Sequence, residues 1–214
     1  MPNKVIVVGA GAVARYVITT AQVSKEFEVV GLIDTFGNPE IWNTEVNGVP
    51  VLGALDKLPQ DVTSCDLILA VSNREQKKVL AESLSNRGFA FRNSIHPTAV
   101  IAPSAVIGVG NIINARVVIE SNATIGNHTI VHAGCVIEHD NVLEDFVNLA
   151  PGVICAGRVT FQEGATVYTG ASLIPGVTIG EYATVGAGAV VIRDVPAHTT
   201  AVGVPAHTLT GRVS

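Results

Sequence analysis

The chain has 214 residues, of which 48% are hydrophobic and 5% aromatic, and it carries a formal net charge of -5. It contains no basic cluster, so nucleic acid is not an expected partner. No apolar run reaches about eighteen residues without Gly, Pro or a polar interruption, which argues against a membrane span. The three cysteines are an odd number without a CxxC pair. They predict no disulfide framework, and we expect a cytoplasmic location.

The chain begins with a pattern typical of a βαβ unit. Residues 4–8 predict a buried parallel strand, which leads directly into Gly9-Ala10-Gly11-Ala12-Val13-Ala14 and an amphipathic helix ending near Val23. A second strand over 28–33 ends at Asp34. A GxGxxA turn with an acid about twenty residues further on is typical of sites that hold a phosphate at a helix N-terminus and a sugar or base near the acid. The sequence thus predicts a site for a phosphate-bearing ligand.

The rest of the N-terminal region supplies only part of a second such unit. We predict a strand over 66–71, a helix over 73–87 and a last strand over 89–95, with an irregular segment over 35–59 that contains the only Trp. A dinucleotide such as NAD needs two complete halves. The pattern therefore predicts a small, mostly parallel, Rossmann-like α/β domain over 1–94, suited to a mononucleotide or a nucleotide sugar.

Residues 95–196 divide into seventeen blocks of six residues without an insertion. The first residue of every block is apolar, and the fifth is usually small or β-branched. This period predicts a parallel β-helix in which each block forms one short strand, three blocks form a coil, and coils stack to bury a shared core. Cys135 and Cys155 fall at inward positions and are predicted to be core thiols, and Cys65 is also predicted to be structural. Residues 197–214 are predicted to form a C-terminal cap.

His139 is the strongest candidate for a catalytic group. It has an acid on each side, Glu138 and Asp140, and a histidine with a carboxylate neighbour is the usual form of an oriented general base. Residues eighteen positions apart should lie about 4.8 Å apart in neighbouring coils, which places Gly157 beside His139. A base and a backbone oxyanion donor at this separation form the geometry that acyl transfer needs. The spacing alone is equally compatible with a surface histidine at a corner.

Two more histidines lie close to His139 in the sequence. His128 is expected to be a solvated corner residue, and His132 to be a corner residue or to line the same cleft as His139. A zinc site of the carbonic anhydrase type would need three ligands and an open position. These three histidines have no further partner about two coils away, so we expect no metal.

Several segments together resemble a known family. They are the hexapeptide repeats over 95–196, the preceding βαβ domain with Gly9-Ala10-Gly11, and the motifs Ile95-His96-Pro97-Thr98-Ala99, Val136-Ile137-Glu138-His139-Asp140 and Gly203-Val204-Pro205-Ala206. The chain resembles the left-handed β-helix sugar acyltransferases over nearly its whole length. Within them it is similar to the bacterial nucleotide-aminosugar N-acetyltransferases that make bacillosamine or perosamine, with sialic acid O-acetyltransferases as near relatives.

The resemblance implies a homotrimer with active sites between subunits, acetyl-CoA lying along the β-helix, and a nucleotide sugar held by the α/β domain. It implies that His139 is the base, that Asp140 orients it, and that the Gly157 amide donates to the thioester carbonyl. It also implies further binding residues: Gly9, Gly11, Asp34, Ser72 and Asn73 for the nucleotide sugar, and Gly170, Gly186 and Gly188 beside the pantetheine arm.

The chain departs from the family pattern at three positions. Val13 stands where relatives often have a His after the first glycines. Asn148 stands where relatives commonly carry a His near the thioester, and an amide can donate a hydrogen bond but cannot titrate. His132 replaces what is often an Asn. The first difference bears on the sugar nucleotide, and the other two bear on the contacts around the thioester.

The sequence thus predicts an acetyl-CoA-dependent N-acetyltransferase acting on the C4 amine of a nucleotide-linked 4-amino-4,6-dideoxy sugar, in surface glycan synthesis. The alternative from the same machinery is O-acetylation of a sialic acid or similar sugar. Two other classes remain open: a trimeric β-helix metalloenzyme of the carbonic anhydrase type, and a sugar-nucleotide sensor without turnover. The sequence leaves the nucleotide base, the sugar and the acyl chain length undetermined.

Overall fold

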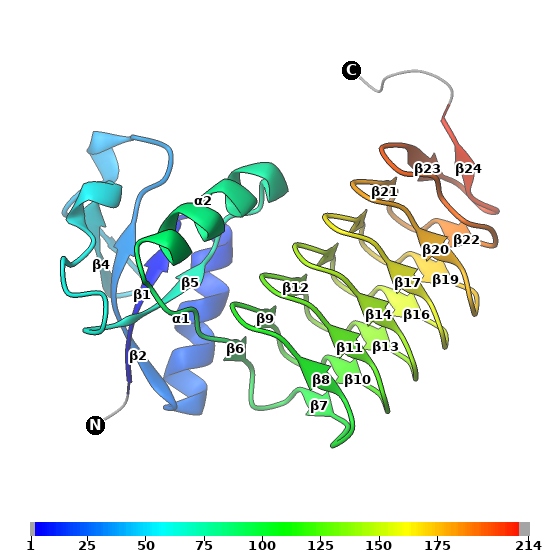
Figure 1. Cartoon of the computed structure of the whole chain (residues 1–214), viewed down its shortest axis with the longest axis horizontal. Helices are drawn as coiled ribbons and strands as arrows, with labels where there is room; N and C mark the ends of the chain where they lie inside the picture. Colours follow the sequence, from blue (N-terminus) through cyan, green and yellow to red (C-terminus); the bar gives the residue numbers. More distant parts are fainter. Residues whose placement is uncertain (1–2, 210–214) are drawn as a thin grey trace. The chain divides into compact units, whose positions relative to one another are not determined.

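The computed structural model describes residues 3–209. The chain divides into two compact units, Met1–Pro97 and Thr98–Ser214, an α/β unit and a long stack of short strands (Figure 1). The part of the predicted C-terminal cap from residue 210 onward lies outside the described residues. Within 3–209, no helix has the length and apolar character needed to cross a bilayer.

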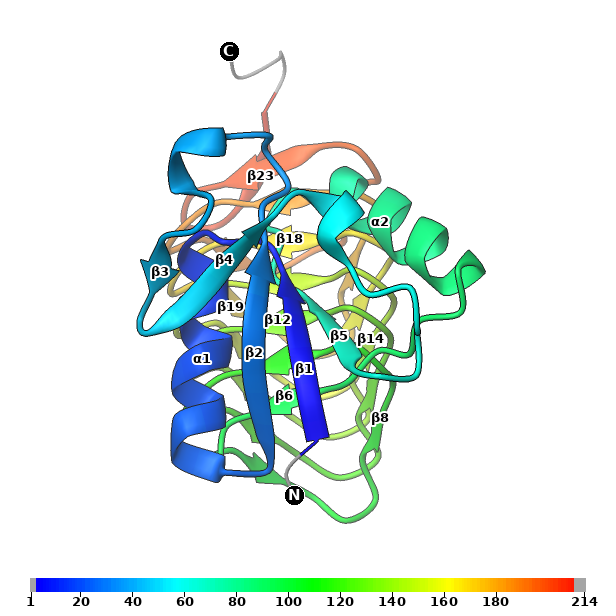
Figure 2. The ribbon, with the colours of Figure 1, turned by 90° about the vertical axis from the view of Figure 1, so that its left-hand side faces the viewer.

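Unit 1 is built on a five-stranded sheet in the order β3-β4-β2-β1-β5, in which only β3 is antiparallel to its neighbour (Figure 2). The sheet confirms the predicted Rossmann-like fold. The elements of this unit are β1 (Asn3–Val8), α1 (Ala12–Ser24), β2 (Phe27–Ile33), the 3-10 helix η1 (Pro39–Ile41), β3 (Glu45–Val46), β4 (Val49–Gly53), the 3-10 helix η2 (Leu55–Lys57), β5 (Asp66–Leu69), α2 (Arg74–Asn86) and β6 (Ser94–Ile95).

Two predictions for unit 1 are wrong in part. The segment 35–59 is not irregular, because β4 pairs in parallel with β2 and forms a hairpin with β3. The hairpin turns at Asn47 and Gly48, which have φ angles of 49° and 79°, and Asn-Gly is the sequence signature of such a turn. The predicted strand over 89–95 is reduced to one bridge at Phe91 and the two residues of β6.

The turn at Gly9 lets the ends of β1, β2 and β5 approach one another closely. Gly9 has φ 119°, and a Cβ built there would lie 2.5 Å from the carbonyl oxygen of Ala70. Its N–H donates to Ile33 O at 2.8 Å. The ends of β1, β2 and β5 therefore meet at one edge of the sheet because residue 9 has no side chain.

Unit 2 confirms the predicted repeat. Residues eighteen apart pair in parallel, as Val118 with Val136 and Ile137 with Cys155. Each block contributes a strand of two residues: β7 (Val100–Ile101), β8 (Val106–Ile107), β9 (Ile112–Ile113), β10 (Val118–Ile119), β11 (Thr124–Ile125), β12 (Ile130–Val131), β13 (Val136–Ile137), β14 (Val142–Leu143), β15 (Asn148–Leu149), β16 (Ile154–Cys155), β17 (Thr160–Phe161), β18 (Thr166–Val167), β19 (Ser172–Leu173), β20 (Thr178–Ile179), β21 (Thr184–Val185) and β22 (Val190–Val191).

The interior of the stack is closely packed and apolar. From Ile113 to Val191 the second residue of every strand is buried, and small residues such as Ala165 and Ala183 fill the inward corner positions. Cys135 and Cys155 are buried in this core, as predicted. Burial raises the pKa of the Cys135 thiol to about 11, so this cysteine is a packing residue and not a nucleophile. The stack ends in β23 (Thr200–Val202) and an antiparallel partner, β24 (His207–Thr208).

The strands of the β-helix form three sheets, and the turns between them form three edges. Within unit 2, sheet I contains β9, β12, β15, β18, β21, β23 and β24, sheet II contains β7, β10, β13, β16, β19 and β22, and sheet III contains β8, β11, β14, β17 and β20. We name each edge by a histidine in its turns: the His132 edge joins sheet I to sheet II, the His139 edge joins sheet II to sheet III, and the His128 edge joins sheet III back to sheet I.

Candidate active site

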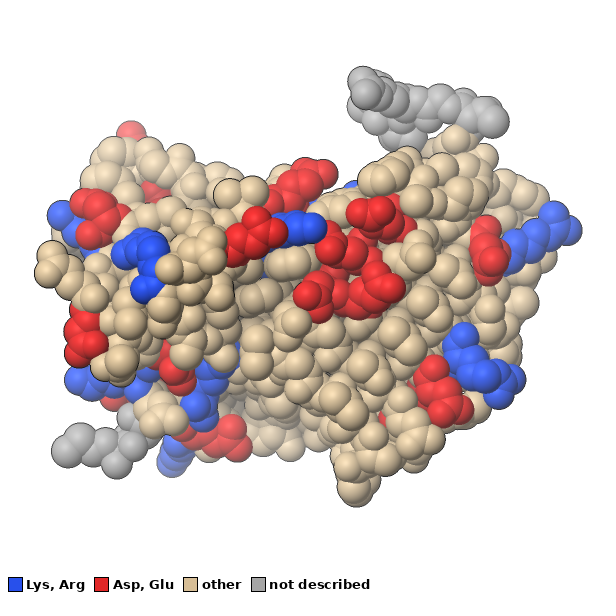
Figure 3. Space-filling model, viewed as in Figure 1, with Lys and Arg blue, Asp and Glu red and all other residues tan. Residues whose placement is uncertain are grey.

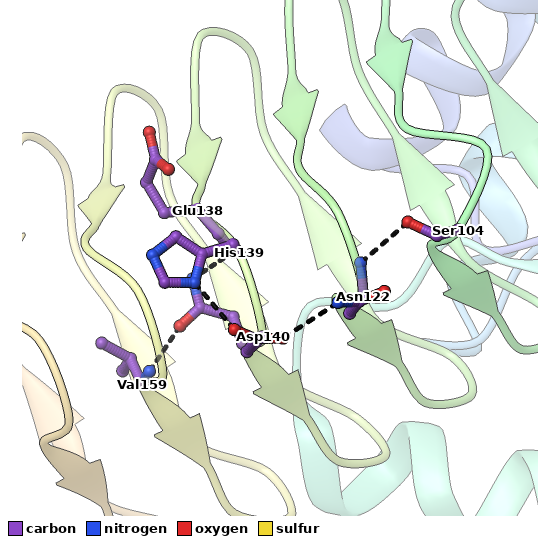
Figure 4. A network of polar contacts seen from close by, with 7 residues as sticks. Ser104, Asn122, Glu138, His139, Asp140 and Val159 are labelled. Atoms are coloured by element: carbon purple, nitrogen blue, oxygen red, sulfur yellow. Dashed lines mark hydrogen bonds and ion pairs between the residues drawn. The ribbon is translucent and has the colours of Figure 1, made fainter.

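His139 and Asp140 form a hydrogen-bonded pair in the turn after β13 (Figure 4). Nδ1 of His139 lies 2.8 Å from Oδ2 of Asp140. Both side chains are about half exposed, so the pair is accessible to a substrate. A carboxylate at Nδ1 favours the tautomer that carries its proton there and leaves the lone pair on Nε2. The arrangement therefore presents Nε2 of His139 as a proton acceptor.

The carboxylate of Asp140 is held by more than its histidine. Asn122, one coil earlier, donates from Nδ2 to Oδ1 of Asp140 at 3.2 Å, and its own N–H donates to Ser104 Oγ at 3.1 Å (Figure 4). The hydrogen bonds from His139 and Asn122, together with the charge of Arg158, hold the pKa of Asp140 below its ordinary value. Subtracting eighteen from 140 would have found Asn122 in the sequence.

Gly157 lies directly beside the histidine ring. A Cβ built on this residue would be 2.5 Å from both Cε1 and Nε2 of His139. The Gly157 N–H donates no hydrogen bond to another residue of the described chain. The predicted adjacency of Gly157 and His139 is therefore confirmed, and the residue beside the proton-accepting nitrogen has an amide that is free among the described residues.

The three histidines that are close in sequence lie on three different edges. His128 is buried rather than solvated, because its ring stacks on Phe146, eighteen residues further on, with centroids 5.4 Å apart. The expectation for His128 is thus wrong. His132 lies on its own edge, with Nδ1 3.4 Å from Nδ2 of Asn114, and does not share a cleft with His139 in one chain. Among residues 3–209, no three His, Cys, Asp or Glu side chains converge as a metal site.

The other predicted acyl-donor residues also lie away from His139. Asn148 belongs to sheet I, and its Oδ1 is buried without a hydrogen-bond partner among the described residues. Gly170 and Gly188 lie on the His132 edge with positive φ, and a Cβ built on either would meet nothing within 4 Å. Gly186 is packed instead, because a Cβ there would lie 2.7 Å from Val202. Within one chain, therefore, the His132 edge and the His139 edge carry separate parts of the predicted site.

Unit 1 gathers its predicted residues at the ends of β1, β2 and β5. Gly11 precedes α1 and has no side chain to accept hydrogen bonds from the first N–H groups of the helix, which face the end of the sheet without a side-chain cap. Ser72 is exposed after β5, and Asn73 caps α2 by accepting from the Gln76 N–H at 2.8 Å. Val13 is buried in the unit, so it does not replace the polar contact that a histidine would offer.

Asp34 is placed differently from an open ligand-binding acid. Its side chain is 2% exposed, and its oxygens accept from Phe36 N at 2.8 Å, Asn38 N at 2.6 Å and Trp42 Nε1 at 3.0 Å. Burial alone would raise the pKa of Asp34, but these hydrogen bonds outweigh burial and hold the pKa below its ordinary value. Both oxygens are thus engaged by the loop that follows β2.

Two pockets differ in their relation to these residues. The larger, of about 340 Å³, lies between the end of α1 and the start of β2, away from the glycine turn, and Lys25 and Glu28 are the ionisable groups in its lining. The smaller, of about 220 Å³, lies between the last turn of the His139 edge and the C-terminal hairpin, with Arg193 and His207 in its wall. It lies on the same edge of the β-helix as His139, unlike the larger pocket.

The chain is similar to proteins that combine the same two parts. The PglD N-terminal domain family matches residues 4–84. A perosamine N-acetyltransferase variant from Caulobacter crescentus, solved with CoA and GDP-perosamine, is 34% identical, with 98% of each chain covered and a TM-score of 0.91. The chain belongs to the hexapeptide-repeat sugar acetyltransferase family. Its β-helix is accordingly the left-handed form.

Two further acetyltransferases support this membership. The acetyltransferase domain of PglB from Neisseria gonorrhoeae FA1090, solved with acetyl coenzyme A, is 30% identical, covers 98% of this chain and 100% of its own, and gives a TM-score of 0.89. UDP-N-acetylbacillosamine N-acetyltransferase of Bacillus subtilis (strain 168) is 37% identical over 117 residues. That match spans 53% of this chain and 52% of the relative.

Proposed function

We propose that the protein transfers an acetyl group from acetyl-CoA to the C4 amine of a nucleotide-linked 4-amino-4,6-dideoxy sugar. The observation that carries the proposal is the arrangement of Asp140, His139 and the free Gly157 amide. It is supported by the family of the chain, whose solved members include complexes with CoA, acetyl coenzyme A and GDP-perosamine.

The chemistry follows from the positions of these groups. Nε2 of His139 accepts a proton from the sugar amine as the amine nitrogen bonds to the thioester carbon, and Asp140 stabilises the imidazolium that forms. The Gly157 N–H donates to the oxygen that becomes negative in the tetrahedral intermediate. When the carbon–sulfur bond breaks, the CoA thiolate leaves and takes up the proton from Nε2. No metal or redox group is needed for the balance of this reaction.

The exposed face of sheet II supports a homotrimer. The outward residues of its six strands are almost all aliphatic, and Val100 and Ile154 are 62% and 50% exposed; the full column is Val100, Val118, Val136, Ile154, Ser172 and Val190. A contiguous apolar face of this kind is typical of an interface between subunits. Closed cyclic symmetry would satisfy it in every subunit.

The edges explain why a trimer would complete the site. Sheet II lies between the His132 edge and the His139 edge. When sheet II faces a threefold axis, the His139 edge of each subunit meets the His132 edge of the next. His139 and Gly157 would then lie opposite the open glycine edge of a neighbour, with Gly170 and Gly188 beside the pantetheine arm and His132 and Asn148 nearby. The residues that one chain separates would thus form one site between two subunits.

The pocket at the end of the His139 edge suits the nucleotide end of CoA. Arg193 lies three coils beyond His139, which is about 14 Å at one strand spacing per coil. Its guanidinium is suited to a phosphate. Acetyl-CoA would lie along this edge with its thioester at Gly157, and the nucleotide sugar would bind at the strand ends of unit 1. We place the reaction in the cytoplasm.

The interface is tested by Ile154→Asp. A charge in the middle of sheet II should reduce the molecular mass in light scattering from that of a trimer to that of a monomer and should abolish turnover. Val106→Asp is the matched control, because Val106 is 61% exposed on sheet III. A variant that stays active as a monomer would contradict the shared site.

The reaction is tested by measuring CoA release from acetyl-CoA with a panel of GDP-, UDP- and dTDP-linked 4-amino sugars, with sialic acid and free monosaccharides beside them. Rapid release with one nucleotide amino sugar is the expected result. Turnover with sialic acid alone would establish the O-acetyltransferase instead. Binding of a nucleotide sugar without CoA release from any acceptor would indicate a sensor.

A further inference from the structure

The loop after β2 is organised around Asp34. Within nine residues, the carboxylate accepts hydrogen bonds from two backbone N–H groups and from the indole of Trp42. Asn38 adds a turn of its own by accepting from the Glu40 N–H at 3.2 Å, which starts the 3-10 helix η1. The backbone of the loop is therefore fixed by its own side chains, in the way that Asx-type turns replace a strand ladder.

This network removes Asp34 from direct ligand binding. A carboxylate after the second strand of a βαβ unit usually accepts hydrogen bonds from a ribose hydroxyl. Here the carboxylate is 2% exposed and both oxygens already accept from the protein. Oδ1 accepts one hydrogen bond and Oδ2 accepts two, and burial beneath the loop keeps a ligand hydroxyl from reaching the carboxylate unless the loop moves. Asp34, the acid of the sequence motif, thus stabilises the conformation of the loop after β2.

The same loop presents an aromatic ring to solvent. Phe36 is 78% exposed, the highest fraction of any large apolar side chain among residues 3–209. It lies two residues from Asp34, and its N–H is held at 2.8 Å. A single exposed apolar residue is common on protein surfaces. This one differs because its backbone is held in place at the edge of the sheet where a ligand is expected.

The loop adjoins the other two strand ends of unit 1. Gly9 N–H donates to Ile33 O, just before Asp34. Gln76 of α2 donates from Nε2 to Thr35 O at 3.3 Å, just before Phe36. The glycine turn, the start of α2 and the Asp34 loop are therefore neighbours. In open α/β sheets, ligands bind at the carboxyl ends of the strands.

We infer that Phe36 is the stacking platform for the nucleobase of the nucleotide-linked substrate, and that Asp34 is a positioning residue that fixes this platform without touching the ligand. Stacking tolerates any base because every base has a π face. The Phe36 ring therefore supplies affinity for a nucleoside diphosphate. This inference rests on the proposed function, because it assigns the base-binding part of that site.

The test uses the full chain and sugar-free UDP, GDP and dTDP, measured by calorimetry. Phe36→Ala should weaken the tightest of the three by at least about 5-fold, the lower end of what base–aromatic stacking contributes. Phe36→Tyr should bind as the wild type does. Phe36→Leu, which keeps apolar bulk without a π face, should behave like Phe36→Ala. Val23→Ala, another exposed apolar residue at the far end of α1, is the control and should change nothing.

The role of Asp34 is tested in the same assay. Asp34→Asn replaces one acceptor oxygen with an amide that faces N–H donors, so the loop should loosen. The chain has a single Trp, and the emission of Trp42 should shift to the red. Affinity for the nucleoside diphosphate should fall, but Asp34→Asn added to Phe36→Ala should cost little more, since Asp34 acts through Phe36. An additive loss would show that Asp34 contacts the ligand itself and would overturn this assignment.

The outcomes separate the inference from the proposed function. Unchanged affinity in Phe36→Ala, together with normal CoA release from a nucleotide amino sugar, would overturn the platform and leave the enzyme as proposed. A wild-type protein that neither binds any nucleoside diphosphate nor turns over any nucleotide sugar would overturn both.

Discussion

Asp34 in unit 1 and Asp140 in the β-helix are both carboxylates whose pKa is held below its ordinary value by hydrogen bonds, yet Asp34 is buried and Asp140 is exposed. The partners of Asp34 come from its own loop, two to eight residues further along the chain. Those of Asp140 are its neighbour His139 and, one coil earlier, Asn122. The loop around Asp34 depends on that carboxylate for its conformation. The coil that carries Asp140 is held by its neighbouring coils and keeps its conformation without the carboxylate.

The largest effect expected from this comparison is on catalysis at the stacked coil. His139→Ala should lower kcat by about 10²- to 10⁴-fold, the contribution of a general base. The melting temperature should not change, because the coil is held by backbone contacts such as Arg158 N–H to His139 O at 3.0 Å. Steady-state kinetics and thermal denaturation check both statements. His198→Ala, on the His128 edge, is the matched control, and wild-type kcat in His139→Ala would refute the base assignment.

Gly157→Ala should have the next largest effect. A Cβ at this position would lie 2.5 Å from Nε2 of His139, so the imidazole ring must move from its position beside Gly157. We expect kcat to fall by about 10²- to 10³-fold, within the contribution of a positioned general base, because Ala keeps the backbone N–H and the change displaces only the ring. In a His139→Ala background the clash is absent, so the same change should cost no stability. A destabilisation that persists in the double variant would point to the backbone rather than to the ring.

Replacing the buried Asp34 should affect the free energy of unfolding. Asp34→Asn should lower the free energy of unfolding by about 1.5–3 kcal/mol, the range for a hydrogen bond to a charged group, whereas Asp140→Asn should leave the melting temperature nearly unchanged. The folded pKa of Asp34 is below 3.8, so its stabilisation is complete above that pH and is lost as pH falls through the folded value. Urea titrations between pH 2 and 7 should show a weaker loss at acid pH in Asp34→Asn than in the wild type.

The smallest effect is expected at Asn122. Asn122→Ala removes one exposed hydrogen bond to Asp140, and such a bond contributes about 0.5–1.5 kcal/mol, or about 2- to 12-fold in kcat. Because Asp140 then holds the histidine less firmly, the pH–rate profile should shift as well, which a merely structural change would not cause. Ser104→Ala is the control, since it removes only the acceptor of the Asn122 backbone N–H. An unchanged profile in Asn122→Ala would exclude a positioning role.

The sequence predicted the repeat more accurately than the loops, for a physical reason. The period of six residues fixes the strands from β7 to β22 and the eighteen-residue contacts between them, including Gly157 beside His139. It does not extend to the last turn, where Thr184 pairs with Thr200 at an offset of sixteen residues. The same arithmetic would have placed His128 on Phe146. Closeness in sequence was a poorer guide than the period. His128, His132 and His139 are close in the sequence, but they are in consecutive turns and so lie on three different edges.

Unit 1 was harder to predict because its contacts follow no period. The strand β4 is short and contains Pro50, and only the Asn47-Gly48 turn signalled it. The spacing of Asp34 from the glycines predicted a ligand contact, but no pattern in the sequence shows that the next eight residues supply three donors to its carboxylate. Side-chain networks within a loop depend on its exact course, which only the structure provides.

The stacked register also fixes the distances between residues along each edge of the β-helix. The distance along the His139 edge from Gly157 to Arg193 is two coils, and it can change only in steps of one strand spacing, about 4.8 Å. Removing or adding eighteen residues between them would shorten or lengthen the path and leave both ends facing the same way. Removing a single residue would instead rotate every later side chain out of its face. Under the proposed function, the length of acyl carrier that fits along this edge therefore changes only in whole strand spacings, and a chain with one coil more or less should prefer a carrier of different length.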